Sequence, residues 1–118
     1  MLDSYREMLM RGSQSQTPDA ALAQEQVRRL LEQAVGNLPD EFRTVFVMRD
    51  IESMSGEETA DVLGIPVATV KTRLLRARRR LREMLRPQIG TALAGTLPFA
   101  GADCAALTDR VMKALGLD

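Results

Sequence analysis

Apolar residues recur at helical spacing over much of the chain, and the clearest run begins just after Pro66. Its apolar positions are three or four residues apart, which predicts an amphipathic helix with one buried stripe. A second run of the same kind starts at Pro18 and Asp19 and ends at Gly36 and Asn37. The expected inward positions are Val67, Val70, Leu74, Ala77, Leu81 and Leu85 in the first helix, and Leu22, Val27, Leu30, Leu31, Ala34, Val35 and Leu38 in the second.

Two shorter helices are predicted between these runs, because residues typical of helix ends occur there. Pro39 suits a first helical turn, and the two acidic residues after it favour the positive end of a helix dipole. Ser55 and Glu58 have the spacing of a capping box, and Gly64 supplies the left-handed residue that ends a helix. The first short helix is expected to bury Phe42, Val45 and Phe46.

The two ends of the chain differ in composition from the middle. Residues 1–18 include RGSQSQTPD, a polar stretch that predicts a flexible linker or tail. After Pro87 the stretch TALAGTLPFAGA predicts an irregular connector before a terminal helix at 103–116. The predicted fold is all-α: residues 19–86 form a small four-helix domain with a C-terminal helix-turn-helix, and residues 87–118 form a connector and a short helical extension. The expected cap and inward positions of the terminal helix are Asp103, Ala106, Leu107, Val111, Met112 and Leu115.

The residue types present argue against several classes of site. There is no histidine, which nearly excludes a zinc centre or a His-based triad, and no catalytic pair of acids or Gly-rich phosphate loop occurs at useful spacing. We therefore predict no enzymatic activity, no cofactor and no metal. Cys104 is the only cysteine, so an internal disulfide cannot form, which fits a reducing cytoplasm. No charge-free run is long enough to cross a membrane, so we expect no membrane insertion.

Charge is distributed unevenly although the whole chain is neutral. Residues 1–66 have a net charge of −6, residues 67–86 of +7 and residues 87–118 of −1. A basic stripe confined to one helix indicates a surface that binds a polyanion such as nucleic acid. A solvated helix face is the alternative interpretation, and charge alone does not decide between the two.

A short helix, a turn at Gly64 and a basic second helix form a helix-turn-helix pattern. On the second helix, steps of 100° place small and polar residues and one leucine opposite the apolar stripe. Small residues allow close approach to DNA, arginine can pair with guanine, and an apolar side chain can meet a thymine methyl group. Leu75 is unusual on a polar face, and it either contacts a base or packs against a neighbouring helix or the tail. The outward positions are Ala68, Thr72, Leu75, Arg76 and Arg79, flanked by Lys71 and Arg73.

The stretch LPDEFRTVFVMRDIESMSGEETADVLGIPVATVKTRLLRARRRLREML resembles region 4 of bacterial RNA polymerase sigma factors of the extracytoplasmic-function type. The specific features are LP before a helix ending in FVMRDIE, followed by S-x-E-E-x-A-x-x-L-G-I-P-x-x-T-V-K-x-R-L-x-R-A-R-x-x-L. The match is strong over residues 37–86 and extends weakly back to about residue 20. It implies a small helical domain whose recognition helix reads the promoter −35 element in the major groove, while another face holds the flap of the polymerase β subunit.

The resemblance also implies roles for single residues. Asp50 and Glu52 are expected only to cap a helix or to pair with Arg49. The arginines more than a turn past the groove-facing end are expected to contact polymerase or solvent: Arg80, Arg82 and Arg86. Base and groove-edge contacts are expected from Lys71, Thr72, Arg73, Leu75 and Arg76, and phosphate contacts from Thr69, Arg78 or Arg79 and from the start of the preceding helix near Ser55.

A complete sigma factor of this type also has an upstream domain that binds the −10 element and the polymerase clamp. Residues 1–19 cannot hold that domain, so we expect a fragment, a truncated product or a stand-alone region 4 protein that does not direct initiation by itself. The tail from Leu97 resembles a short C-terminal extension of some members, with Phe-x-Gly-x-x-Cys before a final helix. It is expected to cover apolar surface, with Cys104 as a buried small side chain rather than a redox sensor.

Three functions fit these observations. The first is a DNA-binding module that docks on RNA polymerase in the cytoplasm, and it is the function we predict. The second is an interaction module of the same shape that binds an anti-sigma factor or polymerase without reading DNA; the missing upstream domain and the unusual tail favour it. The third is a dimeric repressor or activator, in which the terminal helix at 103–116 would have to form the dimer.

Overall fold

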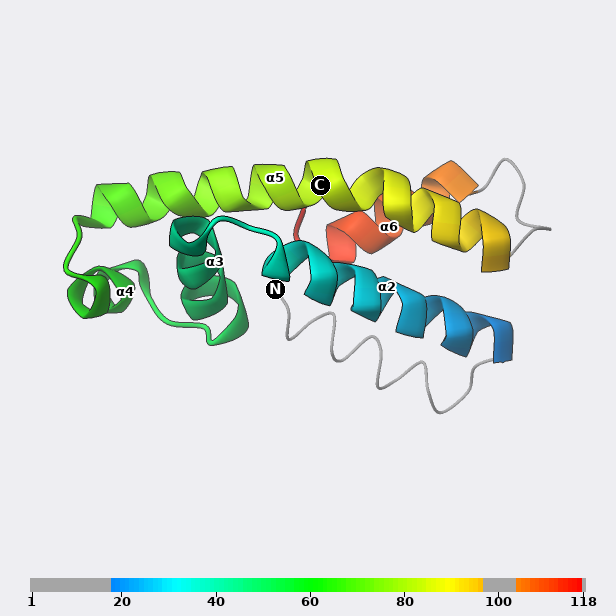
Figure 1. The fold of residues 1–118 in the computed structure, drawn as a ribbon, viewed down its shortest axis with the longest axis horizontal. Helices are drawn as coiled ribbons and strands as arrows, with labels where there is room; N and C mark the ends of the chain where they lie inside the picture. The colour runs from blue at the N-terminus through cyan, green and yellow to red at the C-terminus, as the bar shows by residue number, and fades with distance from the viewer. Residues whose placement is uncertain (1–17, 97–103, 118) are drawn as a thin grey trace.

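One long helix organises the molecule, and the other helices pack along it (Figure 1). The computed structural model describes residues 18–96 and 104–117. The elements in chain order are α2 (Pro18–Gly36), α3 (Asp40–Phe46), the π-helical turn η1 (Val47–Ile51), α4 (Gly56–Leu63), α5 (Val67–Thr96) and α6 (Cys104–Ala114). The described ranges contain no strand, and the predicted all-α class is confirmed. No helix within them is both long enough and apolar enough to cross a membrane.

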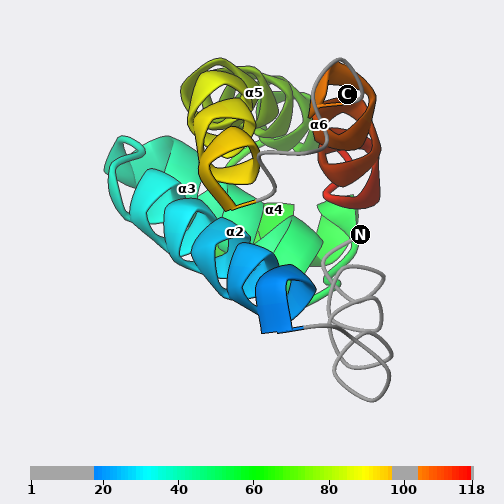
Figure 2. The ribbon, with the colours of Figure 1, turned by 90° about the vertical axis from the view of Figure 1, so that its right-hand side faces the viewer.

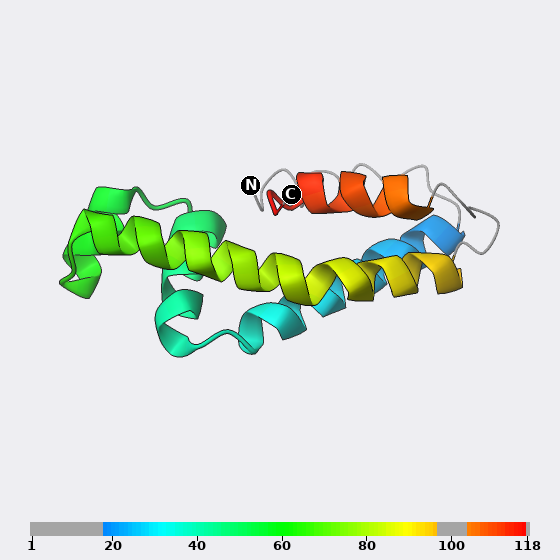
Figure 3. The same ribbon diagram turned by 90° about the horizontal axis from the view of Figure 1, so that it is seen from above.

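The helices divide between the two halves of α5. With 30 residues, α5 spans about 45 Å at the usual rise per residue. Its first half packs against α3 and α4, while its second half packs against α2 and α6 (Figure 1). Views from the end and from above show α2 and α6 on different sides of α5 (Figures 2 and 3). The helix-turn-helix therefore lies at one end of the molecule and α6 at the other.

The core follows a single apolar stripe on α5. Val70, Ala77, Leu81 and Leu85 are completely buried, so the stripe predicted from the sequence is confirmed. Side chains from every other helix of the described part close over this stripe. They are Ala23, Val27, Leu31, Ala34 and Leu38 from α2 and the turn after it, Phe42, Val45 and Phe46 from α3, Ala60 from α4, and Met112, Leu115 and Leu117 from α6 and its end.

Two inward positions were predicted wrongly. Leu22 is 52% exposed, because the buried line on α2 instead passes through Ala23 and Val27, about 100° further round the helix. On α6, Ala106 is exposed and Thr108 is buried, so the inward face is centred one position away from the predicted one. The predicted cap at Asp103, with the rest of 97–103, lies outside the described residues.

Helix α5 continues through Pro87, although residues 91–96 were predicted to belong to an irregular connector. The reason is burial: Ile89 and Leu93 extend the apolar stripe and are 0% and 5% exposed, beneath α2 and α6. Pro87 itself lies on the exposed side of the helix, and the hydroxyl of Thr91 donates to its carbonyl oxygen at 3.0 Å. The proposed division of the chain at residue 87 thus falls inside a continuous helix.

Replacing Pro87 with alanine should stabilise the domain by about 0.5–2 kcal/mol. Proline cannot donate to the carbonyl of the residue four positions earlier, and alanine restores that bond at an exposed position. The larger entropy of the unfolded chain offsets part of the gain. Urea unfolding of Pro87→Ala measures the difference, with Gln88→Ala as an exposed neighbour that should change little. A lower stability of Pro87→Ala would show that the proline is needed for the path of α5.

Helix α4 begins and ends at the residues that the sequence indicated. The hydroxyl of Ser55 accepts from the backbone N–H of Glu58 at 3.0 Å, and the Glu58 carboxylate accepts from the backbone N–H of Ser55 at 3.1 Å. At the other end of α4, Gly64 has φ of 67°, and Ile65 donates to the carbonyl of Ala60 at 3.1 Å. Both the capping box and the left-handed glycine are confirmed.

The capping box should make the stability of the domain sensitive to acid. The Ser55 backbone N–H lowers the pKa of the Glu58 carboxyl below its ordinary value of 4.5. A lowered folded-state pKa gives stability that is present above the unfolded value and is lost as pH falls through the folded one. Glu58→Ala should therefore lower the melting temperature at pH 7, and the difference should shrink as the pH falls below 4.5. A difference independent of pH would contradict this origin.

Candidate nucleic-acid interface

The candidate interface begins at the turn that leads into α5. The carbonyl of Pro66 accepts from the backbone N–H groups of Thr69 and Val70, at 3.0 and 3.2 Å, and so closes the first turn of α5. Val70 is fully buried, which fixes the rotation of the helix about its axis. With that face turned inward against α3 and α4, the opposite face of the first half of α5 points away from the body of the molecule.

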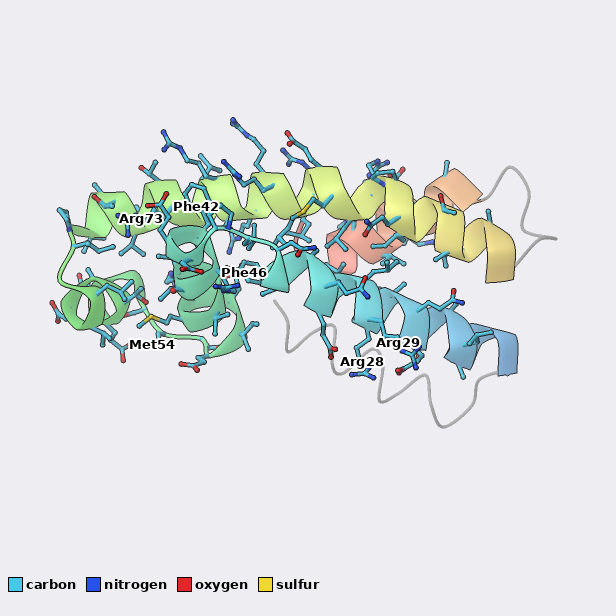
Figure 4. The ribbon with its side chains drawn as sticks, in the orientation of Figure 1. Arg28, Arg29, Phe42, Phe46, Met54 and Arg73 are labelled. Atoms are coloured by element: carbon cyan, nitrogen blue, oxygen red, sulfur yellow. The ribbon has the colours of Figure 1, made fainter. Side chains whose placement is uncertain are left out.

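This outward face carries most of the residues that were predicted to meet DNA, whereas Thr69, Arg73 and Arg78 are half-buried. Figure 4 shows nitrogen-tipped side chains along the side of α5 that is turned away from α2 and α3. Leu75 is 63% exposed, so neither α6 nor a neighbouring helix covers it, and the packing interpretation of this residue is not realised in the described part. The exposed residues of this face are Ala68, Lys71, Thr72, Leu75, Arg76 and Arg79.

The cations of the outward face are not neutralised from within the described part of the chain. Lys71, Arg76 and Arg79 form no ion pair with any residue of 18–96 or 104–117. The hydroxyl of Thr72 donates to the carbonyl of Ala68 at 3.0 Å, so its oxygen can act as an acceptor toward a partner. The face therefore offers positive charge and hydrogen-bonding groups to a partner.

A hollow of about 370 Å³ lies between the start of α3 and the first turns of α5. Arg73 is half-buried beside it, and its Nη2 lies 3.9 Å from Oε2 of Glu41 on α3. Figure 4 shows Arg73 next to Phe42, where α5 crosses α3. Glu41 was not among the predicted site residues, because it precedes Arg73 by a long stretch of sequence and comes from outside the helix-turn-helix. The lining residues are Glu41, Phe42, Ala68, Thr69, Thr72, Arg73 and Arg76.

Arg78 has a different environment from the one predicted. Its Nε and Nη2 donate to the two carboxylate oxygens of Asp50, at 2.9 and 2.7 Å, in a bidentate pair. Asp50 is only 7% exposed. Because its carboxylate pairs with Arg78, the expectation that Asp50 merely caps a helix or pairs with Arg49 is wrong. Arg49 instead donates to the carbonyl of Met54. The pair joins η1 to α5, so the guanidinium that was predicted to contact phosphate is held in a bidentate ion pair within the chain.

Two of the later arginines, Arg80 and Arg86, also have partners within the chain. The guanidinium of Arg80 lies over the ring of Phe42, 4.9 Å from its centroid, which is the geometry of a cation–π contact. Arg86 pairs with Asp109 and so joins α5 to α6. Figure 3 shows α6 alongside the second half of α5, away from the outward face of the first half. Neither contact was predicted, because each joins residues distant in sequence.

Comparison with known proteins agrees with this geometry. The model of the family described as Sigma-70, region 4 matches residues 28–81. The ECF RNA polymerase sigma factor SigW of Bacillus subtilis is 41% identical over 69 residues, which cover 58% of this chain and 37% of the relative. The RNA polymerase sigma-H factor of Pseudomonas aeruginosa is 31% identical over 77 residues, covering 65% of this chain and 40% of the relative.

A third relative, the ECF RNA polymerase sigma-E factor of Escherichia coli K12, is 29% identical over 72 residues, covering 61% of this chain and 38% of the relative. The chain thus matches 37% to 40% of the length of these relatives. No solved structure gives a significant match. The part matched by the family model includes α3, η1, α4 and the first half of α5, so residues 28–81 of this chain are similar to sigma-70 region 4.

Proposed function

We propose that this chain binds promoter DNA sequence-specifically at a −35 element, as the region 4 domain of an alternative sigma factor that docks on RNA polymerase in the cytoplasm. The observation that carries the proposal is the outward face of α5, where cations without an ion pair among the described residues surround small side chains and an exposed leucine. The match of residues 28–81 to region 4 supports the same function.

The outward face suits a helix that enters a major groove. Ala68 and Thr72 are small and lie one turn apart near the start of α5, so the backbone there can approach the floor of the groove. Arg76 follows one turn later and can reach the O6 and N7 acceptors of a guanine. Leu75 beside it gives an apolar surface for a thymine methyl group. This sequence of side chains would distinguish base pairs rather than only attract phosphates.

Affinity would come mainly from the charges at the edges of this face. Lys71 lies at the edge of the row of base-reading residues and Arg79 follows that row along α5, and both are proposed to contact phosphates. Each phosphate that they neutralise releases counterions, so binding should weaken steeply as salt increases. Arg78 is proposed to act differently, by holding α5 against η1 through Asp50.

The polymerase partner is proposed to contact other surfaces of the domain. If the outward face of α5 lies in a groove, then the flap of the β subunit must contact a different surface. An anti-sigma factor is a further partner within this proposal, and it would compete either with DNA or with the flap. The second hypothesis, an interaction module that does not read DNA, predicts the same protein partners without sequence preference on duplexes.

Fluorescence anisotropy tests the proposal directly. The purified chain is titrated against duplexes that contain −35-like elements and against scrambled duplexes of equal length, at several salt concentrations. We expect a preference for one element and a steep loss of affinity as salt rises. Equal binding to all duplexes, or no binding, would reject DNA reading and favour the interaction module. Pull-down with the isolated polymerase β flap would then be the next measurement.

A further inference from the structure

We propose that Glu41, at the start of α3, determines specificity at the DNA interface by holding Arg73 away from phosphates until a matching base pair is present. The inference rests on the proposed function of α5 and adds a residue from outside the helix-turn-helix. It follows from the hollow between α3 and α5, where this carboxylate is the one acid among the lining side chains.

The position of Glu41 places a negative charge where DNA is proposed to bind. The hollow is also lined by Thr69, Thr72 and Arg76, which belong to the proposed phosphate and base contacts. The Glu41 side chain is 55% exposed and that of Arg73 is 30% exposed, so the carboxylate faces solvent at the mouth of the hollow. A phosphate approaching this mouth would be repelled by Glu41 and attracted by the two arginines.

The separation between the two side chains makes the pair easy to exchange. At 3.9 Å, Arg73 Nη2 and Glu41 Oε2 are too far apart for a hydrogen bond, and a solvent-exposed ion pair of this kind is weak. Such a pair biases where the guanidinium lies without fixing it there. A partner that offers two well-placed acceptors, such as the O6 and N7 atoms of guanine, can take Arg73 from Glu41.

The two kinds of DNA complex should therefore respond differently to the loss of this carboxylate. On a matched element Arg73 is already on its base, and removing Glu41 relieves only repulsion. On a scrambled duplex no base takes Arg73, and removing Glu41 frees the guanidinium for a phosphate. Non-specific binding gains one contact that specific binding does not, so the ratio of the two affinities falls.

Glu41→Gln tests the inference, because it removes the charge and keeps the size of the side chain. In the anisotropy assay, affinity for the scrambled duplex should rise about fivefold to tenfold, with a smaller rise on the matched duplex. The slope of log K against log salt on the scrambled duplex should steepen by about 0.9, the value for one additional phosphate contact. A melting curve confirms that the variant is folded.

Glu57→Gln is the matched control. Glu57 is an exposed acid on α4 that has no ion pair in the described part of the chain. Because both variants replace one glutamate with glutamine, they have the same net charge. It should leave the ratio of matched to scrambled affinity unchanged. Compared with Arg73→Ala alone, the double variant Glu41→Gln with Arg73→Ala should gain equally on both duplexes, since the excess gain on the scrambled duplex acts through that guanidinium.

Three outcomes would overturn the inference. Equal gains on matched and scrambled duplexes, or the same change from Glu57→Gln, would show that Glu41 affects binding only through the net charge of the chain. If the excess gain on the scrambled duplex persisted without Arg73, Glu41 would not act through that guanidinium. If the unmodified chain shows a clear preference while one of these results is obtained, only the role of Glu41 fails. If the unmodified chain shows no preference, the proposed function fails with it.

Discussion

Replacing Arg78 with methionine should lower the free energy of unfolding by about 2–4 kcal/mol. The substitution keeps the apolar stem and removes both hydrogen bonds to Asp50, which is 7% exposed. A buried carboxylate without a partner is desolvated, and no hydrogen bond or ion pair compensates for that cost in free energy. Because the Arg78 side chain is about one-third exposed, water can reach part of the site, which places the effect below that of a fully buried pair. Urea unfolding followed by circular dichroism measures this change in the free energy of unfolding.

A double-mutant cycle separates the pair from its surroundings. Asp50→Asn combined with Arg78→Met removes both charges, and it should recover part of the stability lost by Arg78→Met alone. Arg82→Met is the matched control, because Arg82 is exposed on the same helix and has no ion pair among the described residues. A loss below about 0.5 kcal/mol for Arg78→Met would mean that the pair behaves like a surface ion pair. Arg78 would then again be a candidate for phosphate contact.

Replacing Arg76 with alanine should weaken binding to the matched −35 element by about 1–3 kcal/mol. The Arg76 side chain is exposed on the outward face of α5 and has no ion pair in the described part of the chain, so its loss should leave the fold unchanged. If it forms two hydrogen bonds to one guanine, discrimination should be lost at that base pair and retained at the others. Anisotropy against single-base variants of the element measures both effects.

The comparison with scrambled DNA decides what Arg76 does. A phosphate contact would be lost equally from matched and scrambled duplexes, and the salt slope would fall by about one contact. A base contact would be lost mainly from the matched duplex. Arg82→Ala serves as the control, because Arg82 lies beyond the groove-facing end of α5, and it should affect both duplexes little. Equal losses for Arg76→Ala on both duplexes would show that Arg76 contacts the DNA phosphates rather than a base.

Local sequence signals predicted the elements around the candidate interface well. The stripe from Val70 to Leu85, the Ser55–Glu58 cap and the glycine turn each depend on residues a few positions apart, whose spacing is visible in the sequence. The same spacing gave the outward face of α5, since fixing the buried side of a helix also fixes its opposite side. The exposure of Leu75 and Arg76 followed from that argument.

Features that depend on distant residues could not be predicted in this way. Asp50 and Arg78 are 28 positions apart, and nothing in either local sequence indicates that they meet. The extension of α5 past Pro87 depends on the cover that α2 and α6 provide over Ile89 and Leu93. A local helix-breaking signal was outweighed there by burial in tertiary structure. Glu41 was missed for the same reason, because its position beside Arg73 exists only once α3 crosses α5.

The central claim is that the outward face of the first half of α5 reads bases in a major groove. Dimethyl sulfate protection tests it most directly, because the reagent methylates the N7 atom of guanine, which lies in that groove. The preferred duplex is treated with and without the chain, and with the Arg76→Ala variant. We expect protected guanines confined to the −35 element, with protection of one of them lost in the variant. Binding without any protection of N7 would contradict the claim and would place the contact on the phosphates alone.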